Sequence, residues 1–244
     1  MLIDWCDTLH FELRPDGCIS REDLGDSLPE DDLVVRAARA LQQFSATSLG
    51  AHIGIEKRIP TQAGMGGGSS DAASTLLALN RLWQLHLGLD KLQSIGLSLG
   101  ADVPFFLGGH NAWVTGIGEK MLPVALPQAR FVVLKPVQGL PTGRIFSDPL
   151  LKRDTEPAIL SGFAADAFGF GRNDLQTVAE RLCPEIEQAL SWLNASGLSG
   201  RMTGSGSAVF ARTLHDIDTS LASVPFQLRM CNNLPVHPLQ GWAV

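Results

Sequence analysis

The chain has 244 residues, of which 45% are hydrophobic and 18% charged. This composition predicts a globular protein with one large core or two smaller ones and excludes disordered and fibrous classes. The net charge of −6 and a pI near 5.5 argue against a general attraction to nucleic acid or to an anionic membrane.

The four cysteines are scattered without paired spacing, which is typical of reduced thiols and not of a disulfide framework or a zinc site. No apolar run approaches the roughly 20 residues of a membrane span, and the acidic N-terminal segment lacks the order of a signal peptide. We therefore expect a cytoplasmic protein.

Alternating apolar residues predict a first strand at 9–13, followed by a turn at 15–17. Asp31 and Asp32 precede a predicted helix at 33–41, whose apolar face is Leu33, Ala37, Ala40 and Leu41. A second strand is expected over 51–59, with Ile53, Ile55 and Ile59 on one side.

That strand leads into a glycine-rich stretch, Ile59 to Asp71, and then into a helix that runs to about Leu85. Glycines allow a close backbone approach, and the first turn of a helix has unpaired N–H groups and partial positive charge. Together they predict a phosphate-binding loop. No lysine stands beside Ser69, so it is not the common nucleotide loop. The alternative is a surface turn with a Ser or Asp helix cap.

After a shorter helix at 89–97, Asp102 stands between a glycine turn and a rigid apolar segment, 103–109. It is the carboxylate that we identify as the candidate catalytic group. The alternative for Asp102 is a turn or helix-capping aspartate.

The second half begins with a strand and turn at 112–120 and a buried strand at 130–136. From 139 to 171 the chain is rich in loops, and we place a domain boundary between 128 and 129, which gives domains 1–128 and 129–244. A long helix is expected from Asn173 to about Asn194, kinked or divided at Pro184.

A second glycine and serine turn lies at 202–207, before a strand, and can be either part of a site or a plain hairpin. A short helix near Asp216 to Ala222 and a strand at 226–230 complete an α+β fold.

Three motifs in this order resemble the GHMP family of small-molecule kinases: 60–73, 100–104 and 203–206. Three further stretches, 30–38, 79–83 and 141–146, are similar to the branch of that family that acts in non-mevalonate isoprenoid (terpenoid) biosynthesis. The resemblance covers essentially the whole chain. It implies a two-domain fold with ATP and substrate in the cleft between the domains. The implied activity is ATP-dependent phosphorylation of the 2-hydroxyl of a cytidine diphosphate-linked methylerythritol, with Mg²⁺ as cofactor.

The resemblance also implies residue roles. Asp102 would accept the proton of the attacking hydroxyl, and Thr142 and Phe146 would contact the substrate, where an aromatic face can stack on cytosine. Packing of a strand and a helix cap are the alternatives for these two residues. By similarity, Gly204 and Gly206 line the same cleft, and Lys57 and 31–33 lie near the adenine. The expected ATP-binding residues are Pro60, Thr61, Gln62, Ala63, Gly64, Met65, Gly66, Gly67, Gly68, Ser69 and Ser70.

The sequence departs from the family pattern at its start. Family members begin with a Pro-Ala-Lys-(Ile/Leu)-Asn strand and a following Gly-Tyr-His, whose lysine and histidine serve the phosphoryl-transfer and cytidine sites. This sequence contains neither motif and no tyrosine, as in a fragment, a truncated version or a chain with a late start codon. We expect the 244-residue polypeptide by itself to be weakly active or inactive.

Two other functions remain open. One is a GHMP kinase for another alcohol, such as homoserine or mevalonate, and the other is a non-catalytic nucleotide-binding module. The expected partner is a small-molecule substrate, without nucleic acid or membrane, and the expected assembly is a monomer or a weak homodimer. The acidic charge makes an RNA-binding role a distant fourth hypothesis.

Overall fold

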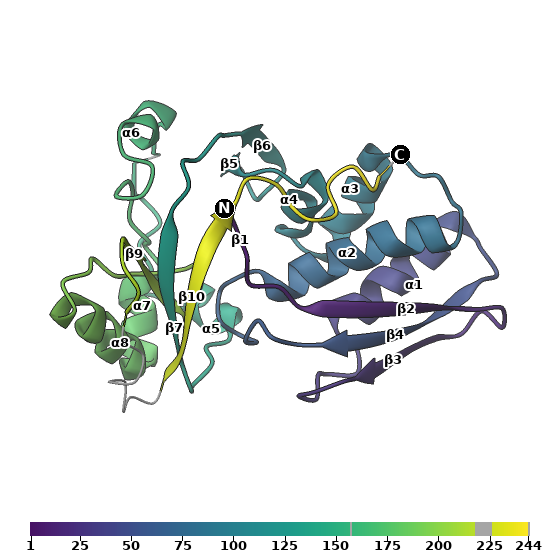
Figure 1. Cartoon of the computed structure of the whole chain (residues 1–244), viewed down its shortest axis with the longest axis horizontal. Helices are drawn as coiled ribbons and strands as arrows, with labels where there is room; N and C mark the ends of the chain where they lie inside the picture. The colour runs from purple at the N-terminus through teal and green to yellow at the C-terminus, as the bar shows by residue number, and fades with distance from the viewer. Residues whose placement is uncertain (157, 218–225, 244) are drawn as a thin grey trace. The chain divides into compact units, whose positions relative to one another are not determined.

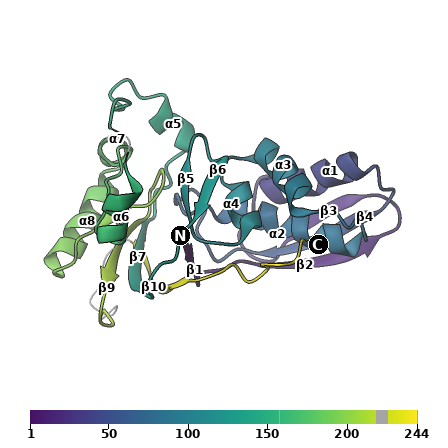
Figure 2. The same cartoon turned by 90° about the horizontal axis from the view of Figure 1, so that it is seen from above.

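The computed structural model describes residues 1–156, 158–217 and 226–243, and their contacts divide the chain into two compact units. Unit 1 comprises Met1–Ile59, Gly66–Ala125 and Leu234–Val244, and unit 2 comprises Pro60–Met65 and Leu126–Asn233. The described helices and strands mix throughout, so the α+β class is confirmed. Figures 1 and 2 show the elements of each unit.

Unit 1 is built on a three-stranded sheet of order β2-β4-β3, in which β2 is antiparallel and β3 parallel to the central β4. Helices α1 and α2 cover one face of this sheet, and α3 packs against these two helices (Figure 1). Its elements are β1 (Leu2–Ile3), β2 (Thr8–Arg14), β3 (Ile19–Asp23), α1 (Leu33–Ser45), β4 (Gly50–Glu56), α2 (Gly67–Leu82), α3 (Leu89–Leu99), α4 (Val103–Gly108), β5 (Ala112–Thr115) and β6 (Lys120–Pro123).

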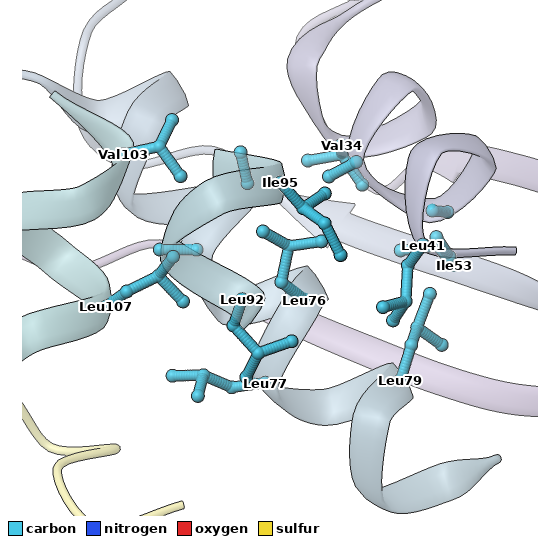
Figure 3. Packing of buried hydrophobic residues seen from close by; sticks show 14 of the residues in the cluster. Val34, Leu41, Ile53, Leu76, Leu77, Leu79, Leu92, Ile95, Val103 and Leu107 are labelled. Carbon is cyan, nitrogen blue, oxygen red and sulfur yellow. The ribbon is translucent and has the colours of Figure 1, made fainter. Parts of the chain in front are cut away.

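The core of unit 1 lies between the sheet and its helices (Figure 3). Ile53 and Ile55 point into it from β4, as the alternation predicted, and Leu76 and Leu79 fill it from α2. Each side chain of this size stabilises the fold by about 1.5–3 kcal/mol relative to exposure. The core therefore fixes the start of α2 against the end of β4.

Helix α1 begins where the acidic pair predicted, because the side chain of Asp32 accepts the N–H of Val35 at 3.0 Å. Its buried face is broader than expected. Ala37 and Leu41 are buried as predicted, but Leu33 and Ala40 are only partly buried. Helix α1 packs against α2 and α3 as well as the sheet, so Val34, Val35 and Ala38 are buried too.

Unit 2 contains the antiparallel strand order β10-β7-β9-β8. The central strand β7 is buried along most of its length, as its continuous apolar run predicted. Its elements are β7 (Arg130–Pro136), α5 (Thr142–Phe146), α6 (Leu160–Ala165), α7 (Gln176–Leu182), α8 (Pro184–Ala195), β8 (Arg201–Met202), β9 (Val209–Thr213) and β10 (Phe226–Leu234).

The helix predicted over 173–194 is divided at Pro184, which forms the first turn of α8 and cannot donate a backbone hydrogen bond to α7. The apolar stripe that runs through both helices is in the core of unit 2. The expected strand at 226–230 is part of β10. The helix expected near 216–222 falls largely on residues 218–225, which lie outside the described residues.

The units differ from the expected division of 1–128 and 129–244 in two stretches. Residues 60–65 belong with unit 2, because the carbonyls of Gln62 and Ala63 accept the N–H groups of Ser207 and Ala208. The C-terminal stretch belongs with unit 1. Trp242 packs against the core of that unit, and the guanidinium of Arg81 lies over the ring of Trp242.

Among the helices that the structure describes, none combines the length and apolar composition needed to cross a membrane.

Candidate active site

Helix α2 begins at Gly67, so Gly67–Ser70 form its first turn instead of extending the loop as expected. Gly66 stands before this turn with a φ of 72°, a conformation that favours glycine, and it has no side chain to cap the helix. Its carbonyl accepts the N–H of Ser70 at 2.9 Å. The N–H groups of Gly67, Gly68 and Ser69 precede this bond in the helix and are available to an anion.

The glycines here allow a close approach that a side chain would block. A Cβ at Gly66 would lie 3.0 Å from the ring of Phe106, and a Cβ at Gly67 would lie 2.9 Å from Ile59 and 3.4 Å from Nζ of Lys57. The ammonium group of Lys57 is therefore close to the first turn of α2. The helix start itself favours negative charge at this turn.

The preceding segment, 60–65, is held by the second glycine and serine turn. Thr203 donates its hydroxyl to the carbonyl of Gly64 at 3.1 Å. A Cβ at Gly64, whose φ is 67°, would lie 2.4 Å from the carbonyl oxygen of Thr203. The turn at 203–206 connects the antiparallel strands β8 and β9, as the hairpin alternative predicted, and it also packs directly on the first part of the predicted phosphate loop.

Asp102 lies immediately before α4 and is exposed. It stands in a turn at the N-cap position of α4, as the alternative predicted, but its side chain makes no capping hydrogen bond to that helix. One turn further along α4, the ring of Phe106 contacts Gly66 at the start of α2. Helix α4 thus carries an unengaged carboxylate and packs on the helix that offers the N–H donors.

Thr142 and Phe146 stand one turn apart on α5, and both are exposed. The hydroxyl of Thr142 lies 2.8 Å from that of Ser205, and the ring of Phe146 keeps 54% of its surface exposed. Pro141, not Thr142, stands at the cap position. Neither residue has the packing or capping role that was the alternative to substrate contact.

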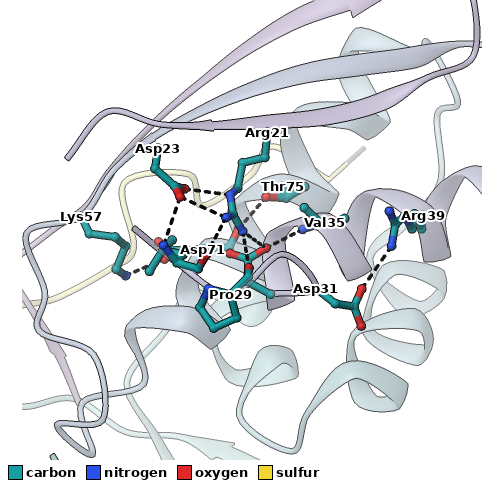
Figure 4. Close-up of polar contacts among 11 residues, drawn as sticks. Arg21, Asp23, Pro29, Asp31, Val35, Arg39, Lys57, Asp71 and Thr75 are labelled. Carbon is teal, nitrogen blue, oxygen red and sulfur yellow. Dashed lines mark hydrogen bonds and ion pairs between the residues drawn. The ribbon is translucent and has the colours of Figure 1, made fainter. Parts of the chain in front are cut away.

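A buried ionic cluster supports the junction of β4 and α2. The ammonium of Lys57 contacts the carboxylates of Asp7 and, at 2.7 Å, Asp71 (Figure 4 shows Lys57 and Asp71). Asp7 also accepts the N–H groups of Arg58 at 2.6 Å and Ile59 at 2.8 Å. All three side chains are at most 8% exposed. Two carboxylates thus share one buried cation.

This arrangement shifts the pKa values of Asp71 and Lys57. Burial raises the pKa of Asp71 from its ordinary value of 3.8 to about 7, with the neighbouring Asp7 adding to the effect and Lys57 opposing it. Burial also acts to lower the pKa of Lys57, but the two carboxylates outweigh it and raise that pKa. Asp71 is therefore the group of the cluster that titrates near neutral pH.

We predict that Asp71→Asn removes a pH dependence from the stability of the protein. Between about pH 4 and pH 7 the native state binds the Asp71 proton more tightly than the unfolded chain does. The free energy of unfolding therefore falls as pH rises through this range. Urea unfolding of the wild type and the variant between pH 4.5 and 8.5 measures the difference, and the variant should gain stability relative to the wild type towards pH 7. Asp26→Asn, at an exposed position, is the control, and parallel curves for Asp71→Asn and the wild type would contradict the prediction.

Arg21 organises the chain that enters α1 (Figure 4). Its guanidinium contacts Asp32 at 2.9 Å and Asp23 at 2.8 Å, and it donates to the carbonyl groups of Leu28 and Pro29. Asp32 is also the cap of α1. Leu33 follows it, and its side chain lies 3.5 Å from where a Cβ of Gly68 would stand. The predicted adenine-side stretch 31–33 therefore adjoins the start of α2.

Sequence reasoning missed Asp7, Arg21 and Ser207. Asp7 faces Lys57 only because β2 pairs with β4 in the register Thr8↔Glu56, so its role depends on a pairing across 50 residues.

Among the described residues no group of three His, Cys, Asp or Glu side chains could hold a metal ion. Glu119 accepts the N–H of Ile117 at 2.7 Å within its own turn, as a turn residue does.

Comparisons with known proteins agree with this architecture. The sequence matches the models for the GHMP kinases N terminal domain over residues 32–110 and GHMP kinases C terminal over residues 156–223. It is 73% identical over 244 residues to the 4-diphosphocytidyl-2-C-methyl-D-erythritol kinase of Albidiferax ferrireducens, covering 100% of this chain and 85% of that protein. It is 63% identical over 247 residues to the protein of the same name from Paracidovorax citrulli, covering 100% and 87%.

Solved structures show the same fold. The crystal structure of a 4-(cytidine 5'-diphospho)-2C-methyl-D-erythritol kinase matches with a TM-score of 0.77 at 32% identity, covering 94% of this chain and 87% of that one. Homoserine kinase from Cytophaga hutchinsonii matches with a TM-score of 0.75 at 14% identity, covering 96% and 88%, which bears on the fold alone. The two-unit fold with its glycine-rich helix start defines a GHMP kinase. The chain belongs to this family and, within it, to the 4-diphosphocytidyl-2-C-methyl-D-erythritol kinases.

Proposed function

We propose that the protein transfers the γ-phosphoryl group of ATP to the 2-hydroxyl of 4-diphosphocytidyl-2-C-methyl-D-erythritol, a step of non-mevalonate isoprenoid biosynthesis. The observation that carries the proposal is the start of α2, where the N–H groups of Gly67, Gly68 and Ser69 precede the first helical hydrogen bond beside the ammonium of Lys57. Such a helix start binds phosphate. The substrate comes from the names of the relatives.

Each candidate residue has a role in this proposal. The backbone of 60–70 holds the ATP phosphates, and Lys57 and 31–33 lie on the nucleotide side. Asp102 takes the proton of the 2-hydroxyl as that oxygen attacks the γ-phosphorus and the bond to the β-phosphate oxygen breaks, which releases ADP. Thr142 and Phe146 orient the cytidine end, and Gly204 and Gly206 allow the loops to pack closely. Positioning and electrostatic stabilisation supply most of the rate.

We propose that Mg²⁺ is used together with ATP. In proteins this ion is usually bound through one or two carboxylates together with substrate phosphates and water, instead of a full protein cage. The exposed carboxylate of Asp102 is compatible with that kind of binding. The ion would neutralise charge on the phosphate oxygens during transfer.

Two alternatives are kept. The first is a GHMP kinase for another alcohol, such as homoserine or mevalonate. The second is a nucleotide-binding module without catalysis. We also propose a cytoplasmic protein that is a monomer or a weak homodimer and that does not bind nucleic acid.

A coupled ATP-consumption assay with Mg²⁺ separates these functions. The cytidine substrate, homoserine and mevalonate are compared as acceptors. We expect turnover with the cytidine substrate only. Turnover with another acceptor would favour the first alternative, and ATP binding without turnover would favour the second.

A further inference from the structure

Three segments of unit 2 that are distant in sequence meet at one buried serine. They are 60–65, the first part of the proposed ATP loop; 136–142, which leads into α5; and the turn at 203–207. Ser207 is fully buried. Its N–H donates to the carbonyl of Gln62 at 3.2 Å, and its hydroxyl donates to the carbonyl of Gln138 at 2.8 Å. One residue thus binds the other two segments through two different groups.

These segments approach each other closely at two glycines. A Cβ at Gly139 would lie 2.6 Å from the side-chain oxygen of Gln62, and a Cβ at Gly204 would lie 2.5 Å from the carbonyl oxygen of Gly64. A shift of one segment therefore moves the others. The segments 136–142 and 203–207 are also in contact through the hydroxyl groups of Thr142 and Ser205.

A buried lysine supports the same carbonyl. Nζ of Lys135 donates to the carbonyl of Pro136 at 2.6 Å and to that of Gln138 at 3.3 Å. The lysine is 5% exposed, and burial lowers its pKa. The carbonyl of Gln138 thus accepts two donors, and the loop before Thr142 is held from both sides.

We propose that Ser207 is a positioning residue that fixes the substrate-side segment 136–142 against the ATP-side segment 60–65, so that Thr142 and Phe146 are oriented before the substrate binds. Preorganised contacts lower the entropy that must be lost on binding. The effect of Ser207 therefore lies mainly in the affinity for the cytidine substrate, and less in that for ATP, because its N–H contact with Gln62 belongs to the backbone. This inference rests on the proposed function.

The test uses Ser207→Ala, which removes the hydroxyl and keeps the N–H. A lost hydrogen bond of this kind corresponds to a change of about 3- to 10-fold, so KM for the cytidine substrate should rise about 3- to 10-fold. KM for ATP should change by less than about 2-fold. Ser196→Ala, which removes a hydroxyl donating to the carbonyl of Trp192 at the end of α8, is the matched control and should leave both constants unchanged.

Hydrogen–deuterium exchange of the unliganded protein gives a second readout that needs no substrate. Ser207→Ala should speed exchange in 138–146 about 3- to 10-fold, while α7 and α8 stay protected as in the wild type. Lys135→Met, which removes the other donor to the same carbonyl, should act in the same direction.

Unchanged KM and exchange in Ser207→Ala would overturn the inference. A general loss of kcat with faster exchange throughout unit 2 would also overturn it, because that is the result of a merely structural role. If the wild type fails to phosphorylate the cytidine substrate, the proposed function fails, and the exchange measurement still decides whether Ser207 holds the two segments together.

Discussion

Replacing Asp102 by asparagine is expected to lower kcat for the cytidine substrate by about 10²- to 10⁴-fold, the range that a positioned general base contributes. Asparagine has the size of aspartate but cannot take the proton of the attacking hydroxyl. The exposed side chain makes no capping bond to α4, so folding should be unaffected. Initial rates at saturating ATP and substrate measure the effect, and thermal unfolding verifies the fold.

The matched control for this substitution is Asp90→Asn. Asp90 is also exposed and lies near the start of a helix of unit 1, in the first turn of α3, but it has no proposed role. It should retain the activity of the wild type. An Asp102→Asn variant with more than about a tenth of the wild-type kcat would be inconsistent with a general base that contributes 10²-fold or more.

Lys57→Met is expected to lower the free energy of unfolding by about 3–5 kcal/mol at pH 8, the cost of leaving buried charge without its partner. Asp7 and Asp71 would then face each other without a cation, although both are almost fully buried. Because these contacts join the end of β4 to α2, ATP binding should weaken as well. Urea unfolding and calorimetry with an ATP analogue measure the two effects.

Lys91→Met provides the control, because Lys91 is an exposed lysine of α3 and its replacement should change stability by less than about 0.5 kcal/mol. The double variant Lys57→Met with Asp71→Asn should recover part of the loss, since it removes one of the two unpaired carboxylates. A loss below about 1 kcal/mol in Lys57→Met would show that the cluster does not stabilise the junction.

Local patterns in the sequence predicted much of the fold. The alternation of Ile53 and Ile55 predicted β4, the acidic pair before Leu33 predicted the cap of α1, and Pro184 predicted the division between α7 and α8. In each case a property of a few neighbouring residues, such as apolar period, capping or a missing N–H, decides the structure.

Elements that depend on distant contacts were not predictable in the same way. Strand β3 has a mixed polar sequence and pairs in parallel with β4, a partner that no local pattern reveals. The short helices α4 and α5 begin at or next to prolines in segments that read as loops. The broader buried face of α1 follows from its packing against two other helices, which sequence period alone does not give.

The candidate site likewise has parts that local patterns predicted and parts that depend on distant contacts. The glycine-rich stretch predicted the start of α2 because it combines glycines with a helix, although the first turn begins at Gly67 and not beyond Ser70. Ser207 and Asp7 have no sequence signal of their own. Their roles come from hydrogen bonds to segments 69 and about 50 residues away, which form only in the folded chain.

The most direct test of the central claim is to identify the product by ³¹P NMR after incubation of the protein with ATP, Mg²⁺ and the cytidine substrate. The account predicts ADP and, in equal amount, a new phosphomonoester on the 2-hydroxyl of the methylerythritol, which forms about 10²- to 10⁴-fold more slowly with Asp102→Asn. Release of inorganic phosphate without an ester, or an ester at another hydroxyl, would contradict it.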